Sequence, residues 1–151
     1  MKKIDIAAAL SREGAAYPPP FDLPCAGRVR RFLGEAGGLT TFGVNQLTLP
    51  PGAWSSQRHW HSHEDEFIWV VSGEATLVTD SGEEILRAGD CAAFAAGDGD
   101  GHHFVNRSDA PVVLLEVGGR APDRDRTVYS DIDLIAEPGE DGYRKRDGSP
   151  Y

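Results

Sequence analysis

The residues best suited to chemistry lie in two short clusters that hold all five histidines of the 151-residue chain, namely His59, His61 and His63, and then His102 and His103. In an extended strand alternate side chains share a face, so His59 and His61 point to one side while Trp60 points to the other. Neutral imidazoles are usual ligands of borderline divalent metal ions. The first cluster therefore predicts two metal ligands facing a sheet interior. His63 shares the alternation and is the alternative partner of His61, but we interpret it as exposed or outside the ligand set.

Glu66 follows the first cluster and opens the apolar run of residues 67–71. A carboxylate at the head of such a strand costs several kcal/mol if it is buried without a partner. A metal ion would remove that cost, so Glu66 is predicted to be a third ligand. Glu64 and Asp65 are interpreted as solvated acids, and either one could replace Glu66 if the loop bends differently.

The first cluster and its surroundings resemble the first motif of the cupin superfamily, which is a Gly, His-x-His, three or four residues, a Glu, six residues and a Gly. The matching residues in this chain are Gly52, His59, His61, Glu66 and Gly73. Gly52 lies one residue further from His59 than in the usual form of the motif. The flanking sequence is similar to that of small single-domain bacterial cupins, whose biochemical role is unassigned.

The second cluster lies in a stretch, residues 89–106, that resembles the second cupin motif. Adjacent side chains of a strand point to opposite faces, so only one of His102 and His103 can face the site. His102 is favoured because its spacing to Asn106 matches the motif. The loop before it departs from the motif, with Ala95 in place of a proline and a longer glycine-rich segment.

The resemblance implies a site in which His59, His61, Glu66 and His102 hold one divalent transition metal ion, which is iron, manganese, nickel, zinc or copper. Three imidazoles and one carboxylate leave one or two positions open on an ion that prefers five or six ligands. Such a site suits a metal-dependent enzyme that acts on a small oxygen-rich organic substrate by isomerase, lyase or dioxygenase chemistry. The alternative is a non-catalytic cupin module that binds or senses a small ligand. No residue is assigned a catalytic role.

The elements that position these residues are predicted to be short strands separated by Gly, Pro and Asp turn signals. From residue 54 to residue 117 such segments recur about every 8 to 12 residues, with no helical period between them. This pattern predicts an all-β antiparallel sandwich or barrel, which the cupin resemblance narrows to a double-stranded β-helix, or jelly-roll barrel. Residues 4–13 are Ala-rich and predict a short helix that ends before the proline run 18–20, and residues 29–33 predict a first strand.

The length of the chain favours one domain. We expect it to consist of an N-terminal arm (residues 1–27), a cupin β-barrel domain (residues 28–119) and a C-terminal extension (residues 120–151) that packs on the barrel. The long flanking segments, together with the common pairing of sheets between cupin subunits, predict a homodimer with a small molecule as ligand or substrate.

The composition argues against other partners. The formal net charge is -9, whereas nucleic-acid affinity comes from Lys and Arg that neutralise phosphates. No apolar run approaches the roughly 20 residues that span a bilayer, so we expect no membrane contact and a cytoplasmic location.

Cys25 and Cys91 are predicted to be free thiols, with Cys91 in the core. Arg28, Arg30 and Arg31 are interpreted as a solvated strand face rather than as a cationic clamp for a substrate.

Overall fold

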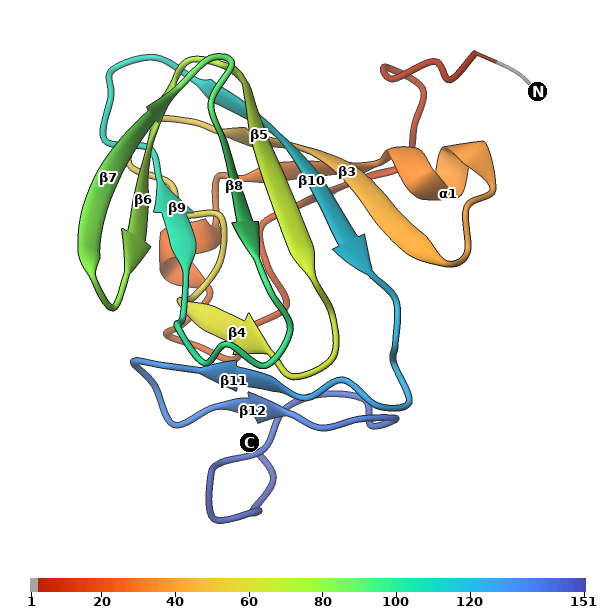
Figure 1. Cartoon of the computed structure of the whole chain (residues 1–151), viewed down its shortest axis with the longest axis vertical. Coiled ribbons are helices and arrows are strands. Elements are labelled where there is room, and N and C mark those ends of the chain that lie inside the picture. The colour runs from red at the N-terminus through yellow and green to blue at the C-terminus, as the bar shows by residue number, and fades with distance from the viewer. Residues whose placement is uncertain (1–2) are drawn as a thin grey trace.

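The structure of the chain is a computed structural model that describes residues 3–151, so Met1 and Lys2 of the predicted arm lie outside the described residues. Its strands pair in antiparallel fashion, and Figure 1 shows them wrapped into a barrel with a further small sheet across one end. The predicted all-β class and jelly-roll barrel are confirmed.

The largest sheet has six strands and forms one wall of the barrel. In order across the sheet they are β1 (Ser11–Glu13), β2 (Val29–Phe32), β3 (Phe42–Leu49), β10 (Val112–Gly119), β5 (Glu66–Ser72) and β8 (Cys91–Phe94). On β5, Ile68 and Val70 are buried, whereas Phe67, Trp69 and Val71 are exposed. This alternation is typical of an antiparallel sheet that turns one face to the core.

Two three-stranded sheets complete the molecule. The opposite wall has the order β7 (Gly82–Arg87), β6 (Glu74–Thr79) and β9 (His103–Val105). The third sheet has the order β12 (Ile135–Ala136), β11 (Thr127–Tyr129) and β4 (His59–His61), and it lies across the lower end of the barrel in Figure 1. Strands of the extension therefore pair with the strand that carries the first histidine cluster.

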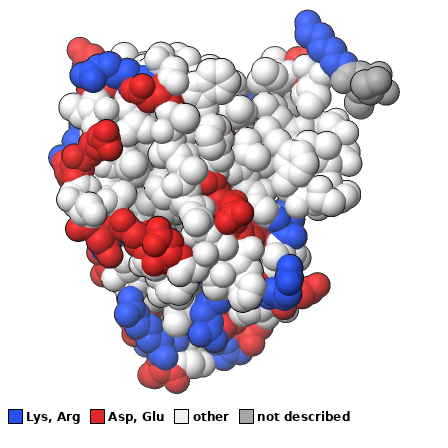
Figure 2. Space-filling model, viewed as in Figure 1, with Lys and Arg blue, Asp and Glu red and all other residues white. Residues whose placement is uncertain are grey.

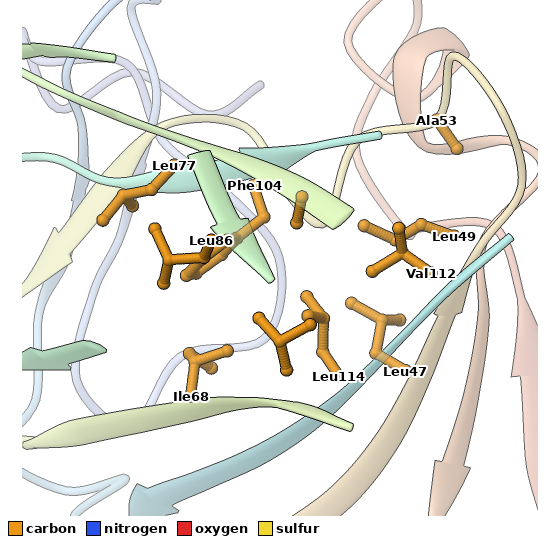
Figure 3. Packing of buried hydrophobic residues seen from close by; sticks show 11 residues of the cluster. Leu47, Leu49, Ala53, Ile68, Leu77, Leu86, Phe104, Val112 and Leu114 are labelled. Carbon is orange, nitrogen blue, oxygen red and sulfur yellow. The ribbon is translucent and has the colours of Figure 1, made fainter. Parts of the chain in front are cut away.

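The apolar core lies between the two walls. Figure 3 labels most of its members, which are Leu47, Leu49, Ala53, Ile68, Leu77, Leu86, Phe104, Val112 and Leu114. Ile68 lies two residues after Glu66, and Phe104 lies two residues after His102. Because close packing fixes the backbone at these positions, the core also fixes the positions of the polar residues beside it.

The predicted helix over residues 4–13 is wrong. Residues 6–8 form a turn in which Asp5 Oδ1 accepts a hydrogen bond from the backbone N–H of Ala7 (3.0 Å), and β1 follows in place of the helix. A helix shorter than about 12 residues is marginal in water, whereas β1 gains backbone hydrogen bonds by pairing with β2. The regular helices within residues 3–151 are the 3-10 turn η1 (Leu23–Cys25) and α1 (Leu33–Gly37), neither of which was predicted.

The predictions for the first strand and for the cysteines can also be compared with the structure. The first barrel strand, predicted over residues 29–33, is confirmed as β2. Both cysteines are free thiols, as predicted, but Cys91 is exposed and not in the core, because it faces outward on β8. The division into arm, barrel and extension stays a prediction. None of the described helices is long and apolar enough to cross a membrane.

The charges on the surface are distributed unevenly. On the face in Figure 2, acidic side chains gather beside β6 and β7, while basic ones gather at the end that carries β11 and β12. Acidic residues are interspersed with the basic ones at that end. The visible surface therefore presents mixed charge there rather than a broad basic stripe.

Candidate metal centre

Three of the four predicted ligands, the imidazoles, converge on a carboxylate oxygen of the fourth, Glu66, inside the end of the barrel. The Nε2 atoms of His59, His61 and His102 lie 3.8, 3.7 and 2.9 Å from Oε2 of Glu66. The ligand atoms of His59, His61 and Glu66 all lie within 4.8 Å of one another, and His102 adjoins this group through Glu66. The two histidine clusters thus meet in space.

Backbone pairing explains why they meet. The strand alternation of β4 places His59 and His61 on one face, with ring centroids 5.0 Å apart. The backbones of His59 and His102 exchange two hydrogen bonds, at 3.2 and 2.9 Å, which bring the second cluster beside the first. Phe94 pairs with Glu66 across β5 and β8, and its ring stacks on the His102 ring at 3.4 Å between centroids. The aromatic contact holds the third imidazole against the carboxylate.

The imidazoles of His59 and His61 also have polar partners at their Nδ1 atoms. His59 Nδ1 lies 2.9 Å from the Gln57 carbonyl oxygen, and His61 Nδ1 lies 2.6 Å from Oδ2 of Asp125. An Nδ1–H that donates to either oxygen leaves the Nε2 lone pair of the neutral ring free for a metal ion. Asp125 comes from the extension and was not singled out in the sequence, where it lies in a run of alternating acids and arginines without a motif.

The electrostatic setting favours the protonation states that ligands need. Burial lowers the pKa of His59 to about 3, with His102 and His61 adding to the effect and Glu66 opposing it. Burial alone would raise the pKa of Glu66, but the His102 contact and the neighbouring imidazoles lower it to about 2. Near neutral pH the site therefore offers a neutral imidazole at His59 and a carboxylate anion at Glu66.

These residues fit a metal ion. Two ligand atoms about 2.1 Å from one ion and roughly 90–110° apart around it are separated by about 3.0–3.4 Å. The observed separations from Glu66 Oε2, 2.9–3.8 Å, are close to this range. Oε2 is buried and makes no well-oriented hydrogen bond within the described chain, which is costly for a carboxylate oxygen unless a cation is its partner.

The alternative histidines lie elsewhere. His63 is exposed, and its Nδ1 lies 2.9 Å from the Ser62 hydroxyl. His103 is buried on the opposite face of its strand, where its ring packs edge-on against Trp54 at 4.6 Å and its Nδ1 lies 3.0 Å from the Ser56 carbonyl oxygen. The alternation of adjacent side chains separates His103 from the site.

The alternative carboxylates have structural partners. Oε1 of Glu64 accepts a hydrogen bond from the backbone N–H of Ala121 (2.5 Å), and Oδ1 of Asp65 accepts one from that of Ala96 (2.8 Å). Glu64 also forms a second group of nearby ligand atoms with His61 and Asp125. Nδ1 of His61 lies 2.6 Å from Oδ2 of Asp125, whereas its Nε2 lies 3.7 Å from Oε2 of Glu66, so the two acids lie near different nitrogens of the ring.

A cavity of about 430 Å³ opens onto the four residues. Its walls include Tyr17 from the arm, Tyr129 and Tyr143 from the extension, and four arginines, which are Arg12, Arg28, Arg30 and Arg120. Arg28 is buried, so the interpretation of this side chain as part of a solvated strand face is wrong. Its neighbours in sequence gave no signal that the arm would fold over β2 and cover it.

The three tyrosines pack on one another and on the metal site. The ring centroids of Tyr17 and Tyr143 lie 5.5 and 5.9 Å from that of Tyr129, which itself stacks on His59 at 5.7 Å. Burial raises the pKa of Tyr17 to about 12 and that of Tyr129 well above its usual value. The phenols of Tyr17 and Tyr129 therefore stay protonated near neutral pH, and the Tyr17 hydroxyl accepts a hydrogen bond from the backbone N–H of Gln57 at 3.4 Å.

An antiparallel jelly-roll barrel with imidazoles and a carboxylate gathered inside one end is the architecture of the cupins. The model of the cupin domain family matches residues 45–118, which include all four predicted ligands. A cupin-superfamily protein from Silicibacter pomeroyi is 45% identical, over 99% of this chain and 96% of its own. The chain belongs to the cupin superfamily.

The similar solved structures differ in how closely they match this chain. The Silicibacter pomeroyi structure superposes with a TM-score of 0.93 and is named a sugar phosphate isomerase. A protein from Acidithiobacillus ferrooxidans, provisionally given the same name, is 26% identical over 91% of this chain and 86% of its own, with a TM-score of 0.77. A polyketide cyclase from Streptomyces resistomycificus, 21% identical over 79% of each chain with a TM-score of 0.63, shares the fold alone. No curated protein matches the chain at a significant level.

Proposed function

We propose that the chain is a metal-dependent enzyme that isomerises a small oxygen-rich substrate, with His59, His61, Glu66 and His102 holding one divalent transition metal ion. The observation that carries the proposal is the convergence of three Nε2 atoms on a buried carboxylate oxygen that lacks a well-oriented hydrogen bond. The name of the relative that is 45% identical favours isomerisation, and a phosphorylated sugar as substrate, over lyase or dioxygenase chemistry.

The residues around the site would have different roles in the reaction. A divalent ion held by these four residues would supply Lewis acidity to polarise a substrate carbonyl. Gln57 and Asp125 orient the imidazoles of His59 and His61. The protonated phenol of Tyr17 is suited to donating a hydrogen bond to a substrate hydroxyl in the cavity.

Elemental analysis of protein without a polyhistidine tag tests the metal. We expect about one equivalent of iron, manganese, nickel, zinc or copper in the wild type, and loss of that metal in His59→Ala and in His102→Ala. His63→Ala is the matched control, because His63 is exposed and belongs to the same cluster. Full occupancy in His102→Ala would remove His102 from the ligand set, and absence of metal uptake by the wild type would refute the metal site.

Turnover tests the reaction. Metal-loaded protein incubated in D2O with aldose phosphates is expected to interconvert them with ketose phosphates and to exchange the proton next to the carbonyl, which NMR detects. The His59→Ala variant serves as the inactive control. Saturable binding of sugar phosphates with no turnover or exchange would instead favour the alternative, a non-catalytic cupin that binds or senses a small ligand.

We also propose a homodimer that forms through the outer face of the six-stranded sheet. Phe67, Trp69 and Val71 follow one another along this face of β5, with exposed fractions of 40%, 46% and 50%. Contiguous apolar surface of this kind is typical of interfaces between subunits. Light scattering should give twice the chain mass for the wild type and the chain mass for Trp69→Lys, and a monomeric wild type at micromolar concentration would exclude the dimer.

A further inference from the structure

We propose that the end of the cavity formed by β1 and β2 is an anion subsite, in which Arg28 and Arg12 bind a negatively charged group of the ligand. The inference rests on the proposed function in one respect, because the anionic group is taken to belong to the molecule whose oxygens face His59, His61, Glu66 and His102. The chemistry recognised is that of a phosphoryl group or a carboxylate.

Strand alternation brings the arginines to the cavity. Arg28, Arg30 and Phe32 are spaced two residues apart and all line the cavity, whereas Arg31 between them does not. Arg12 of β1 is the backbone pairing partner of Arg30, which adds a second strand to the same wall. Its guanidinium carbon lies 5.9 Å from the centroid of the Phe32 ring. The guanidinium groups of Arg12 on β1, Arg30 on β2 and Arg28 just before β2 therefore line one wall of the cavity.

Arg28 is the most informative of the three. Its exposed fraction is 3%, yet no carboxylate of the described residues lies within 4.0 Å of its nitrogens, the limit for an ion pair. Its Nε donates to the Gly14 carbonyl oxygen at 3.0 Å and its Nη1 to that of Ser55. Nη2 takes part in neither bond. A buried guanidinium stays charged and is costly without a counter-ion, so an anion supplied by the ligand is the missing partner.

The other charged side chains of the cavity already have partners. Arg30 and Glu116 form a two-pronged pair, with both contacts at 2.9 Å. Arg120 and Glu35 pair at 3.3 Å. Of the remaining acids that line the cavity, Glu66 belongs to the metal centre and Glu64 accepts from the Ala121 backbone. Arg12 and Arg28 are the cavity arginines that remain without a carboxylate partner in the described chain, so this wall carries surplus positive charge.

The subsite is part of the same cavity as the metal centre. Arg28 is tied to the Ser55 carbonyl, and Ser55 lies four residues before His59 along the chain. Both Arg28 and His59 line the single cavity of about 430 Å³, a size that suits a small metabolite. One ligand can thus place an anionic group at the arginines and its other oxygens at the imidazoles. This arrangement would select small molecules that combine a negative charge with a carbonyl or hydroxyl group.

Calorimetric titration with inorganic phosphate and, separately, with acetate tests the subsite. The full chain is titrated both metal-loaded and after EDTA treatment, because phosphate also binds metal ions. We expect saturable binding that survives EDTA and weakens about 10- to 100-fold in Arg28→Gln and in Arg12→Gln, as expected for loss of a charge-assisted hydrogen bond. Arg31→Gln is the matched control on the other face of β2 and should bind as the wild type does.

Each outcome of the titrations either supports the anion subsite or refutes it. Tighter binding of phosphate identifies a phosphoryl group as the natural partner, and tighter binding of acetate identifies a carboxylate. Thermal unfolding checks that the variants fold. If Arg28→Gln does not fold, the comparison of Arg12→Gln with the wild type decides the test. Equal binding by the wild type and Arg12→Gln, or binding that disappears with EDTA, would overturn the subsite. Metal content is measured in the same samples, so failure of the metal site is seen separately from failure of the arginines.

Discussion

Replacement of Asp125 by Asn should weaken metal binding without removing a ligand. Oδ2 of Asp125 lies 2.6 Å from Nδ1 of His61, and the exposed fraction of the Asp125 side chain is 7%. The carboxylate fixes the orientation of the imidazole, and removal of such outer partners costs about 10- to 100-fold in metal affinity. That range corresponds to about 1.4–2.7 kcal/mol. The short, buried geometry places the expectation for Asp125→Asn towards the upper end.

Competition with a chelator of known affinity measures the effect. The dissociation constant of the metal is compared among the wild type, Asp125→Asn and Asp123→Asn, in which Asp123 is an exposed acid of the same segment. Asp125 also accepts a hydrogen bond from the backbone N–H of His63 at 2.8 Å, so urea unfolding of the metal-free proteins is measured alongside. Identical metal affinity in Asp125→Asn and the wild type would refute the role assigned to this carboxylate.

Two further predictions concern the scaffold. A Cβ at Gly73, which has a φ of +84°, would lie 2.8 Å from the Pro111 carbonyl oxygen, so Gly73→Ala should lower the free energy of unfolding by roughly 1–3 kcal/mol. Gly52→Ala, with a φ of +81° and open space around it, should lose less in the same urea titration, and equal losses would contradict the steric argument. Because burial raises the pKa of Tyr17 from 10.0 to about 12, its contribution to stability is present below pH 10 and is lost as pH rises through about 12, by at most about 1.4 kcal/mol per pH unit. Tyr17→Phe should therefore reduce the slope of stability against pH in this window, and an unchanged slope would count against the buried phenol.

The barrel was predictable because its signals are local. Turn residues and short apolar runs, such as residues 67–71 of β5, are properties of neighbouring residues, so the strands could be placed without knowledge of the rest of the chain. Alternation also predicted that only one of His102 and His103 faces the site, and the motif spacing to Asn106 favoured His102, which lies beside Glu66 while His103 packs against Trp54. The helix expected over residues 4–13 failed because a partner strand distant in sequence decided the conformation of Ser11–Glu13.

The walls of the site were not predictable for the same reason. Asp125 reaches His61 through the pairing of β11 with β4, a contact between residues 64 positions apart. Arg28 is buried because the arm lies over the start of β2, where Gly14 supplies a carbonyl oxygen to the guanidinium. Neither residue stands in a motif, and local composition describes both as ordinary solvated charges. Long-range pairing, which the sequence pattern does not encode, gives them their surroundings.

About half of the residues that line the cavity lie outside the segment that matches the cupin family, and this bears on how such chains can diverge. Residues 45–118 contain the predicted metal ligands, whereas Arg28, Tyr17, Tyr129 and Tyr143 all lie beyond that segment. Substitutions in the two flanks can therefore alter which molecule is accepted while the predicted metal ligands stay in place. Grouping of homologues by the shared segment alone would sort them by their predicted ligands. Grouping by the flanks would sort them by substrate.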